Sequence, residues 1–138
     1  MPGAVTHLFI NVGPTLPLTP VSEVRAVARL GLESDAHQKE DGDRQLLLID
    51  EETLQEFDVA PGAVRENIVV RGLGVQGVPF GSRLRLGGVE IELTKECTPC
   101  KMLEGVRPGL MKALVGRRGV YARVLTSGTL RVGDAITP

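Results

Sequence analysis

The segment RLRLGGVEIEL, residues 83–93, is the clearest indication of the fold. Its two halves alternate charged with aliphatic side chains around Gly87-Gly88, and a glycine pair can take the positive φ values of a type I′ turn. A turn of this kind pairs Leu86 with Val89, Arg85 with Glu90, Leu84 with Ile91 and Arg83 with Glu92. One face is then aliphatic, while the other holds opposite-charge pairs, each worth roughly 0.2–1 kcal/mol. The pattern therefore predicts a hairpin with a fixed register.

Segments on both sides of this hairpin also have the composition of strands. They are residues 4–12, 24–30, 45–49 and 66–70, and the continuous apolar run at 45–49 is typical of a strand buried on both faces. Residues 120–132 predict a second hairpin, which turns at Ser127-Gly128. Helices are expected only at residues 51–57, with Asp50 as the N-cap, and at residues 108–116, between Pro108 and Gly116.

The composition of the chain agrees with a small strand-rich protein. The sequence has 138 residues, of which 17 are glycine and only 3% are aromatic, so the core must consist of Val, Leu, Ile and Ala. Strands dominate, and the connections between them are interpreted as too short for parallel crossovers. We predict a mostly β (β-rich α+β) fold, an antiparallel β-barrel with a few short helices, as a single domain over residues 1–138.

Charge and hydropathy exclude several classes of partner. The net charge is −1, from 16 Lys+Arg and 17 Asp+Glu, so neither nucleic acid nor a membrane surface is expected as a partner. The opening residues MPGAVTHLFINVGP do not have the pattern of a signal peptide, and no apolar run approaches the ~18–20 residues of a membrane span. We therefore expect a cytoplasmic protein, in which two cysteines are ordinarily reduced.

Both cysteines lie in TKECTPCKML, residues 94–103, directly after the predicted hairpin. Loops at strand ends are where rigid scaffolds present reactive groups, and the nearby Lys95 and Lys101 favour an ionised thiol. The competing interpretation is that Cys97 and Cys100 simply pack as small apolar residues. A structural zinc site would lack ligands, because the chain has only two histidines. A thioredoxin-like dithiol needs an α/β fold, which the strand-rich pattern disfavours.

Five segments of the chain together resemble one known family. They are VRAVARLGLESDAH (24–37), RQLLLIDEETL (44–54), PGAVRENIVVRGL (61–73), FGSRLRLGGVEIELTKECTPCKML (80–103) and GRRGVYARVLTSGTLRVGDAI (116–136). In this order they are similar to the MOSC domain, the module named after the C-terminal domain of molybdenum cofactor sulfurase. The resemblance covers nearly the whole chain from residue 24 onward. It implies a strand-rich barrel with a pocket that holds a molybdenum–pterin cofactor or handles its sulfur.

The resemblance identifies Cys100 as the working thiol, because Pro99-Cys100 matches the family's Pro-Cys context. In related amidoxime-reducing proteins the second cysteine of a similar pair binds molybdenum, so Cys100 is the expected catalytic residue and metal ligand. Thiolate suits softer transition metals, and an accessible thiolate can also carry persulfide sulfur. The residues expected to bind the cofactor, molybdopterin with its phosphate, are Asp35, His37, Arg44, Arg65, Asn67, Lys101, Arg117 and Arg118.

Several functions are compatible with this resemblance. The leading expectation is a stand-alone domain that binds molybdenum cofactor or carries sulfur on Cys100, with sulfurtransferase or molybdenum-dependent oxidoreductase activity left open. One alternative is a molybdenum-dependent reductase of N-hydroxylated compounds. The implied partners are the small-molecule cofactor and a cysteine desulfurase, a molybdoenzyme or an electron-transfer protein.

A further alternative is a non-catalytic binding or adaptor module on the same scaffold. It is motivated by the segment Ser34-Asp35-Ala36-His37, which lacks the glycine and the arginine usual at this point of the family. The family is also associated with pyridoxal phosphate through full-length sulfurases. These 138 residues contain no aminotransferase-like domain that would bind it, so the chain is not expected to generate sulfur from cysteine itself.

Overall fold

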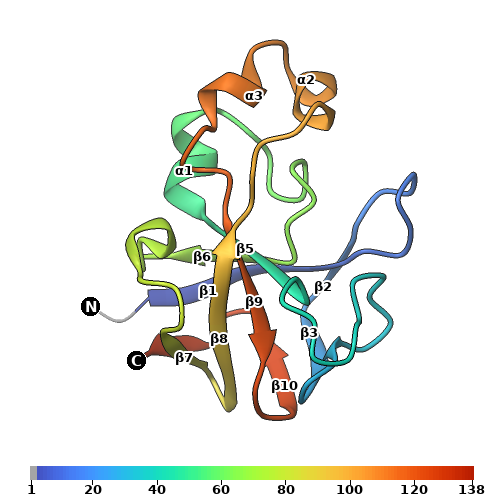
Figure 1. Cartoon of the computed structure of the whole chain (residues 1–138), viewed down its shortest axis with the longest axis vertical. Coiled ribbons are helices and arrows are strands. Elements are labelled where there is room, and N and C mark those ends of the chain that lie inside the picture. The colour runs from blue at the N-terminus through green and yellow to red at the C-terminus, as the bar shows by residue number, and fades with distance from the viewer. Residues whose placement is uncertain (1–2) are drawn as a thin grey trace.

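A closed β-barrel forms the body of the protein in the computed structural model, which describes residues 3–138 (Figure 1). Within that range seven strands follow one another around the barrel in the order β11-β7-β8-β9-β5-β6-β1, and the pairing of β1 with β11 closes it. Their bounds are β1 Gly3–Ile10, β5 Leu46–Asp50, β6 Ile68–Arg71, β7 Arg83–Leu86, β8 Val89–Glu96, β9 Val120–Val124 and β11 Ala135–Thr137. The predicted barrel with a few short helices is confirmed.

One pair of neighbouring strands departs from the expected antiparallel arrangement. β5 and β6 are parallel, with Leu48 paired with Ile68 and Asp50 with Val70. The connection between them runs from residue 51 to residue 67 and contains the helix α1 (Glu51–Glu56). A dozen or more residues suffice for a parallel crossover, so the expectation that every connection is too short was wrong here.

The hairpin at residues 83–93 has the predicted register. β7 and β8 pair Arg83 with Glu92, Leu84 with Ile91, Arg85 with Glu90 and Leu86 with Val89. Leu84 and Ile91 face the barrel interior, whereas both arginines lie on the solvent side and contact Glu90 at 3.7 and 3.8 Å. The turn itself differs from the prediction, because only Gly87, with a φ of 58°, has a positive φ and a type I′ turn needs two such residues.

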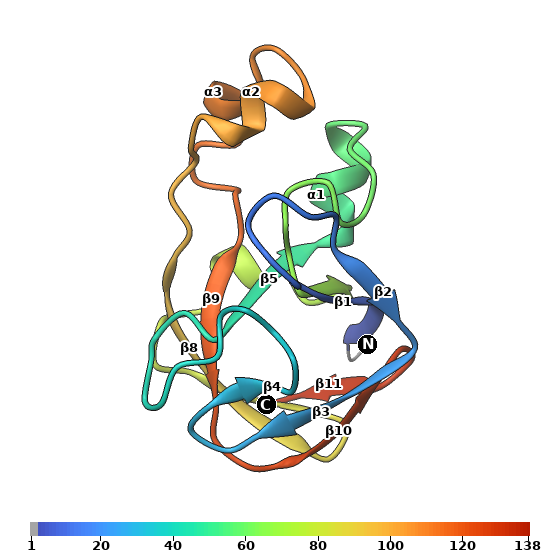
Figure 2. The same ribbon diagram turned by 90° about the vertical axis from the view of Figure 1, so that its right-hand side faces the viewer.

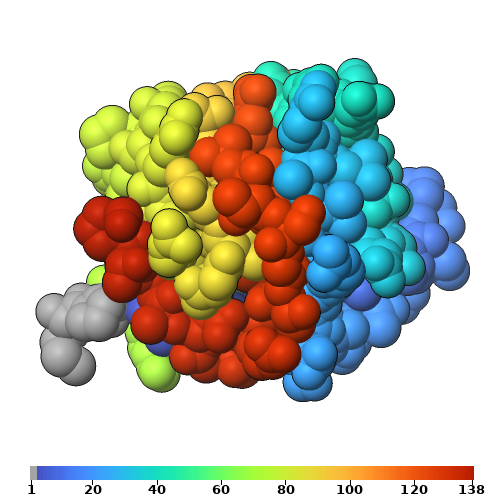
Figure 3. All heavy atoms as spheres, turned by 90° about the horizontal axis from the view of Figure 1, so that it is seen from below, coloured from blue at the N-terminus to red at the C-terminus, as the bar shows by residue number. Residues whose placement is uncertain are grey.

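The prediction of a second hairpin at residues 120–132 was wrong. β10 (Gly128–Arg131) pairs with β3 (Glu23–Val27) rather than with β9, and β3 also pairs with the short β4 (Gly31–Leu32). Both edges of β9 are already occupied, by β5 and β8, so the chain that leaves β9 has no edge there to return to. Seen from the end of the molecule away from the helices, the orange-red region of β9 and β10 lies between the yellow β7–β8 region and the blue β3 region (Figure 3).

Two apolar cores lie on opposite sides of the barrel wall. Leu46 and Leu48 of β5 point into the barrel, while Ile49 belongs to an outer core together with Val69 of β6. The helices cover this outer core on one side of the molecule instead of plugging the barrel (Figures 1 and 2). Burial on both faces explains why residues 46–49 of this strand form a continuous apolar run, as the sequence predicted, while the polar Gln45 precedes the strand.

The helices are short and their ends differ from the predicted ones. α1 begins after Asp50, but the Asp50 carboxylate accepts the N–H of Val75 and makes no cap hydrogen bond. The second predicted helix shortens to α3 (Leu110–Ala113), with Gly109 rather than Pro108 before its first residue. The remaining elements are β2 (Thr19–Val21), the 3₁₀ turn η1 (Val75–Gly77) and the unexpected α2 (Met102–Val106). No helix within residues 3–138 is long and apolar enough to cross a membrane.

Candidate functional site

A cavity of about 300 Å³ is lined by residues of the loops after β1 and β4 and of the segment between β8 and α2. We call it the thiol cavity, because Cys100 is part of its wall. It brings together six of the residues that sequence reasoning selected, His37, Arg44, Arg65, Asn67, Cys100 and Arg118. Its other lining residues are Asn11, Pro14, Leu47, Met102 and Tyr121.

The two cysteines have different environments. Cys97 is buried, and its thiol donates a hydrogen bond to the Tyr121 hydroxyl oxygen at 3.3 Å. Cys100 is exposed at the wall of the thiol cavity. The backbone N–H of Cys97 also bonds to Gly119 O at 3.0 Å, which attaches the start of this loop to the start of β9. The segment therefore buries one thiol as a structural group and presents the other to solvent.

The lysines of this segment are arranged differently from the sequence interpretation. Lys95 Nζ lies 3.2 Å from Asp43 Oδ2, so its charge is compensated by a carboxylate. Lys101 lines a separate groove of about 960 Å³ between the cysteine loop and α3, which we call the outer groove. The positive charge around Cys100 in the thiol cavity comes instead from arginines. Among residues 3–138 no three or more His, Cys, Asp or Glu side chains form a cluster that could hold a metal ion.

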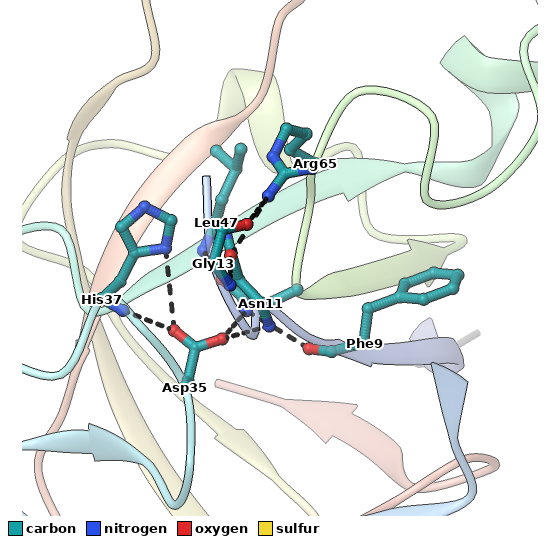
Figure 4. Close-up of polar contacts among 8 residues, drawn as sticks. Phe9, Asn11, Gly13, Asp35, His37, Leu47 and Arg65 are labelled. Carbon is teal, nitrogen blue, oxygen red and sulfur yellow. Dashed lines mark hydrogen bonds and ion pairs between the residues drawn. The ribbon is translucent and has the colours of Figure 1, made fainter. Parts of the chain in front are cut away.

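Asp35 and Asn67 connect separate parts of the chain through hydrogen bonds, and the contacts of Asp35 are drawn in Figure 4. Asn67 Nδ2 donates to Phe9 O at 3.2 Å and to Asp35 Oδ1 at 3.0 Å, while its Oδ1 accepts the Leu47 N–H at 3.0 Å. Asp35 Oδ1 also accepts the N–H of Asn11 at 2.7 Å. Both Asn67 donors are therefore engaged within the protein, and only a lone pair of Oδ1 remains for a ligand.

The loop that contains Asp35 is held in a constrained conformation. Ser34 has a φ of 68°, a left-handed conformation in which glycine is favoured. Asp35 accepts the His37 N–H at 3.0 Å, and the His37 ring lies 3.6 Å from the same carboxylate. Burial alone would raise the pKa of Asp35, but the contacts with His37 and Asn11 outweigh it and lower the pKa below its usual value.

The four predicted arginines have different contacts, and three of them, Arg65, Arg44 and Arg117, lie at least partly exposed. Arg65 donates to Leu16 O, Asn11 Oδ1 and Gly13 O at 2.7–3.1 Å, so its guanidinium holds the loop after β1. Arg44 lies over the ring of Tyr121, with its Cζ 5.4 Å from the ring centroid. Arg117 does not line the thiol cavity; it forms a bidentate ion pair with Glu56 of α1 at 2.6 and 2.9 Å.

Arg118 is the buried cation of the thiol cavity. Only 4% of the residue is exposed, and Nη2 donates to Val64 O at 2.6 Å. Its Nε and Nη1 have no hydrogen-bond partner within residues 3–138. Glu66 is completely buried nearby, and burial raises the pKa of Glu66 to about 7 although the charge of Arg118 opposes this. A buried guanidinium with two unpaired nitrogens favours an anion in the adjoining cavity.

Sequence reasoning missed Tyr121 as a site residue. Burial raises the pKa of Tyr121 to about 12, so its hydroxyl stays protonated at neutral pH. A hydroxyl can donate one hydrogen bond and accept two, so Tyr121 can accept from Cys97 and still donate into the cavity. Tyr121 is the only tyrosine in a chain with 3% aromatic residues, and this rarity was the signal available in the sequence.

Barrel and cavity together define a small β-barrel domain with one accessible thiol at a cavity that also contains a buried guanidinium. The sequence profile of the MOSC domain matches residues 33–137, and the chain belongs to this family. The structure is similar to the YuaD protein from Bacillus subtilis, with a TM-score of 0.82 and 18% identity over 99% of this chain and 94% of that chain.

Two further solved structures share the fold. YiiM from Geobacillus stearothermophilus has a TM-score of 0.79 and 22% identity over 99% of this chain and 74% of its own. YiiM from Escherichia coli has a TM-score of 0.69 and 22% identity over 96% and 68% of the two chains. No curated protein sequence matches the chain. At these identities the likeness establishes the fold alone.

Proposed function

We propose that this MOSC domain binds a molybdenum–pterin cofactor in the thiol cavity, with the Cys100 thiolate as a metal ligand. The observation that carries the proposal is the meeting of two groups at one cavity. Cys100 presents an exposed sulfur there, and Arg118 presents a buried guanidinium with two unpaired nitrogens. A soft sulfur ligand together with an unsatisfied cation matches the two ends of a metal cofactor that carries a phosphate.

The residues of the cavity fit such a group in type and position. Arg118 would compensate the phosphate charge, and Arg44 adds a second cation that stacks on Tyr121. When bound, the molybdenum would supply redox or sulfur chemistry at the Cys100 end of the cavity. Asp35 has no part in contacting the cofactor in this proposal; it fixes Asn11, His37 and Asn67 around the cavity through its two oxygens.

Tyr121 and His37 are the proton-bearing groups of the cavity. Tyr121 keeps its proton at neutral pH and serves as a hydrogen-bond donor to whatever polar atom lies beside Cys100. His37 is about half exposed at the rim, and Asp35 orients its ring. An imidazole nitrogen at the rim can form a hydrogen bond with a polar group in the cavity.

Sulfur carriage on Cys100 is the second candidate function, and the exposure of that thiol favours it. In this reaction the Cys100 thiolate attacks the outer sulfur of a donor persulfide, forms a new S–S bond and releases the donor as a thiolate. Cys97 does not act as a resolving thiol in this scheme, because it is buried and bonded to Tyr121. The added sulfur has a mass of about 32 Da and is removed by a reductant.

Metal analysis separates these functions. The protein is produced in a host that makes the cofactor, and molybdenum per chain is measured for wild type, Cys100→Ser, Arg118→Met and Arg117→Met. We expect bound molybdenum in wild type and in Arg117→Met, whose arginine lies outside the cavity, and at least a tenfold loss in the other two variants. Equal molybdenum in wild type and Cys100→Ser would remove the ligand role. A reducible addition of about 32 Da on Cys100, retained in Cys97→Ser, would instead support sulfur carriage.

A further inference from the structure

A second hollow adjoins the thiol cavity and has a different chemical character. It has a volume of about 460 Å³, and we call it the apolar hollow. Phe9 and Leu18 form part of its wall, and three prolines, Pro17, Pro20 and Pro61, form much of the rest. Arg65 is its only charged lining residue, and that guanidinium is already hydrogen-bonded to the loop after β1. The hollow therefore offers apolar surface and no free polar group of a side chain.

The apolar hollow lies next to the thiol cavity, and the two spaces share part of their walls. Arg65 and Met102 belong to the walls of both, and Met102 follows Cys100 by two residues. The other neighbour of the thiol cavity, which shares His37 and Arg44 with it, is lined mainly by polar and charged residues such as Asp43 and Lys95. The outer groove shares no lining residue with the thiol cavity. Of the two spaces that share a wall with the thiol cavity, the apolar hollow is the one lined mainly by apolar residues.

The wall of the hollow is held in place before any ligand arrives. Arg65 fixes Gly13 and Leu16 of the loop after β1 through hydrogen bonds of 2.7 and 2.9 Å. Gly62 has a φ of 90°, and a Cβ at this position would lie 3.1 Å from the Phe9 ring, so the backbone packs directly on that ring. Prolines fix their own φ angles. A preformed apolar site binds an apolar group without a large ordering cost.

We propose that the apolar hollow binds the aromatic or aliphatic group of a small molecule whose polar end lies beside Cys100. The inference rests on the proposed function of Cys100 and specifies the class of substrate: a compound with a reactive polar group joined to one apolar ring or chain. The polar end lies beside Cys100, and the apolar end lies between Phe9 and Met102. Small polar molecules without the apolar group are poor substrates.

Thiol alkylation tests the subsite directly, without cofactor. Rates of Cys100 modification by N-methyl-, N-butyl- and N-phenylmaleimide are measured on reduced protein, divided by the rates with free cysteine, and assigned to Cys100 by peptide mass spectrometry. We expect the corrected rate to rise about tenfold from the methyl to the phenyl reagent, because the ring is removed from water in the hollow. N-phenylsuccinimide, which cannot react with thiols, should slow the phenyl reagent in a saturable manner.

Two variants assign the effect to one hollow. Ala63→Phe fills the apolar hollow and should abolish the rise, whereas Val115→Phe in the outer groove should leave it unchanged. Two results would overturn the proposal. One is an equal corrected rate for all three reagents with wild type. The other is that Val115→Phe abolishes the increase in rate from the methyl to the phenyl reagent while Ala63→Phe keeps it. If Ala63→Phe does not fold, absence of protection by N-phenylsuccinimide on wild type is decisive against it. Molybdenum content is measured separately, so loss of cofactor binding with an intact rate pattern counts only against the proposed function.

Discussion

Two charged residues are buried at the thiol cavity, Arg118 in its wall and Glu66 nearby. Arg118 and Glu66 are both buried, and each keeps polar atoms without a hydrogen-bond partner within the described chain. Such groups are costly in a folded core unless they are compensated. A proton on Glu66 is one form of compensation, and an anion beside Arg118 is another. Polar atoms that stay unpaired here therefore lower the free energy of unfolding.

Glu66 makes stability depend on pH in a defined direction. Its pKa is about 7 in the folded protein against 4.5 in the reference state, so its stabilising contribution is complete below pH 4.5 and is lost as the pH rises through 7. Glu66→Gln removes this titration. The free energy of unfolding of the variant relative to wild type should therefore rise by up to about 3 kcal/mol between pH 4.5 and pH 8, measured by urea denaturation. A difference that does not change with pH would contradict the buried, protonated state of Glu66.

Cys97 is predicted to act through Tyr121 rather than as a thiol nucleophile. Cys97→Ser keeps a donor beside the Tyr121 hydroxyl, whereas Cys97→Ala removes it and should cost about 1 kcal/mol in stability. Molybdenum retention should be near wild type in Cys97→Ser and reduced in both Cys97→Ala and Tyr121→Phe. If Cys97→Ser loses as much metal as Cys100→Ser, Cys97 has a direct role and the division between the two thiols is wrong.

At the scale of elements, loops attached to the barrel form the cavity, and specific contacts hold them. Arg65 is the main fixation of the loop after β1, through three hydrogen bonds. Arg65→Met should therefore increase cleavage within residues 12–18 in limited proteolysis under native conditions. Arg117→Met is the matched control, because Arg117 pairs with Glu56 on α1. Equal cleavage rates in the two variants would show that Arg65 does not hold the loop.

The start of β9 depends on a glycine at its junction with β5. Gly119 has a φ of 117°, and a Cβ there would lie 2.6 Å from Leu48 O. We expect Gly119→Ala to lower the free energy of unfolding by about 2–4 kcal/mol, because it combines backbone strain with a steric clash.

Gly105 in α2 has open space around it, so Gly105→Ala should stabilise the protein by about 0.5–1 kcal/mol. Thermal denaturation compares the two, and a tolerated Gly119→Ala would refute the close approach.

For the whole molecule, local patterns predicted more than non-local ones. The hairpin at residues 83–93 was predictable because its turn and its paired residues lie within eleven positions of sequence. The partner of β10 was not, because it depends on which strands already occupy the edges of β9. The parallel pairing of β5 with β6 was missed for a related reason. A connecting segment that contains a helix is long enough to bring the chain back parallel to the first strand instead of antiparallel to it.

The candidate site was predictable in outline and not in detail. Six of the nine residues that the family resemblance selected line one cavity, and Asp35, Lys101 and Arg117 do not. Adjacent residues in the sequence also differ in role. Arg117 pairs with α1 at the surface while Arg118 is buried in the cavity wall, and no sequence pattern distinguishes them. Tyr121 is brought to the cavity by the register of β9 with β8 and β5, which only the closed barrel defines.

X-ray absorption at the molybdenum edge tests the central claim most directly, since it reports which atoms surround the metal. The measurement uses cofactor-loaded wild type and cofactor-loaded Cys100→Ser, with Cys97→Ser as the control for the second thiol. If Cys100 is the protein ligand, the sulfur shell of wild type and Cys97→Ser contains one scatterer more than that of Cys100→Ser. Identical sulfur shells in all three proteins would contradict the account.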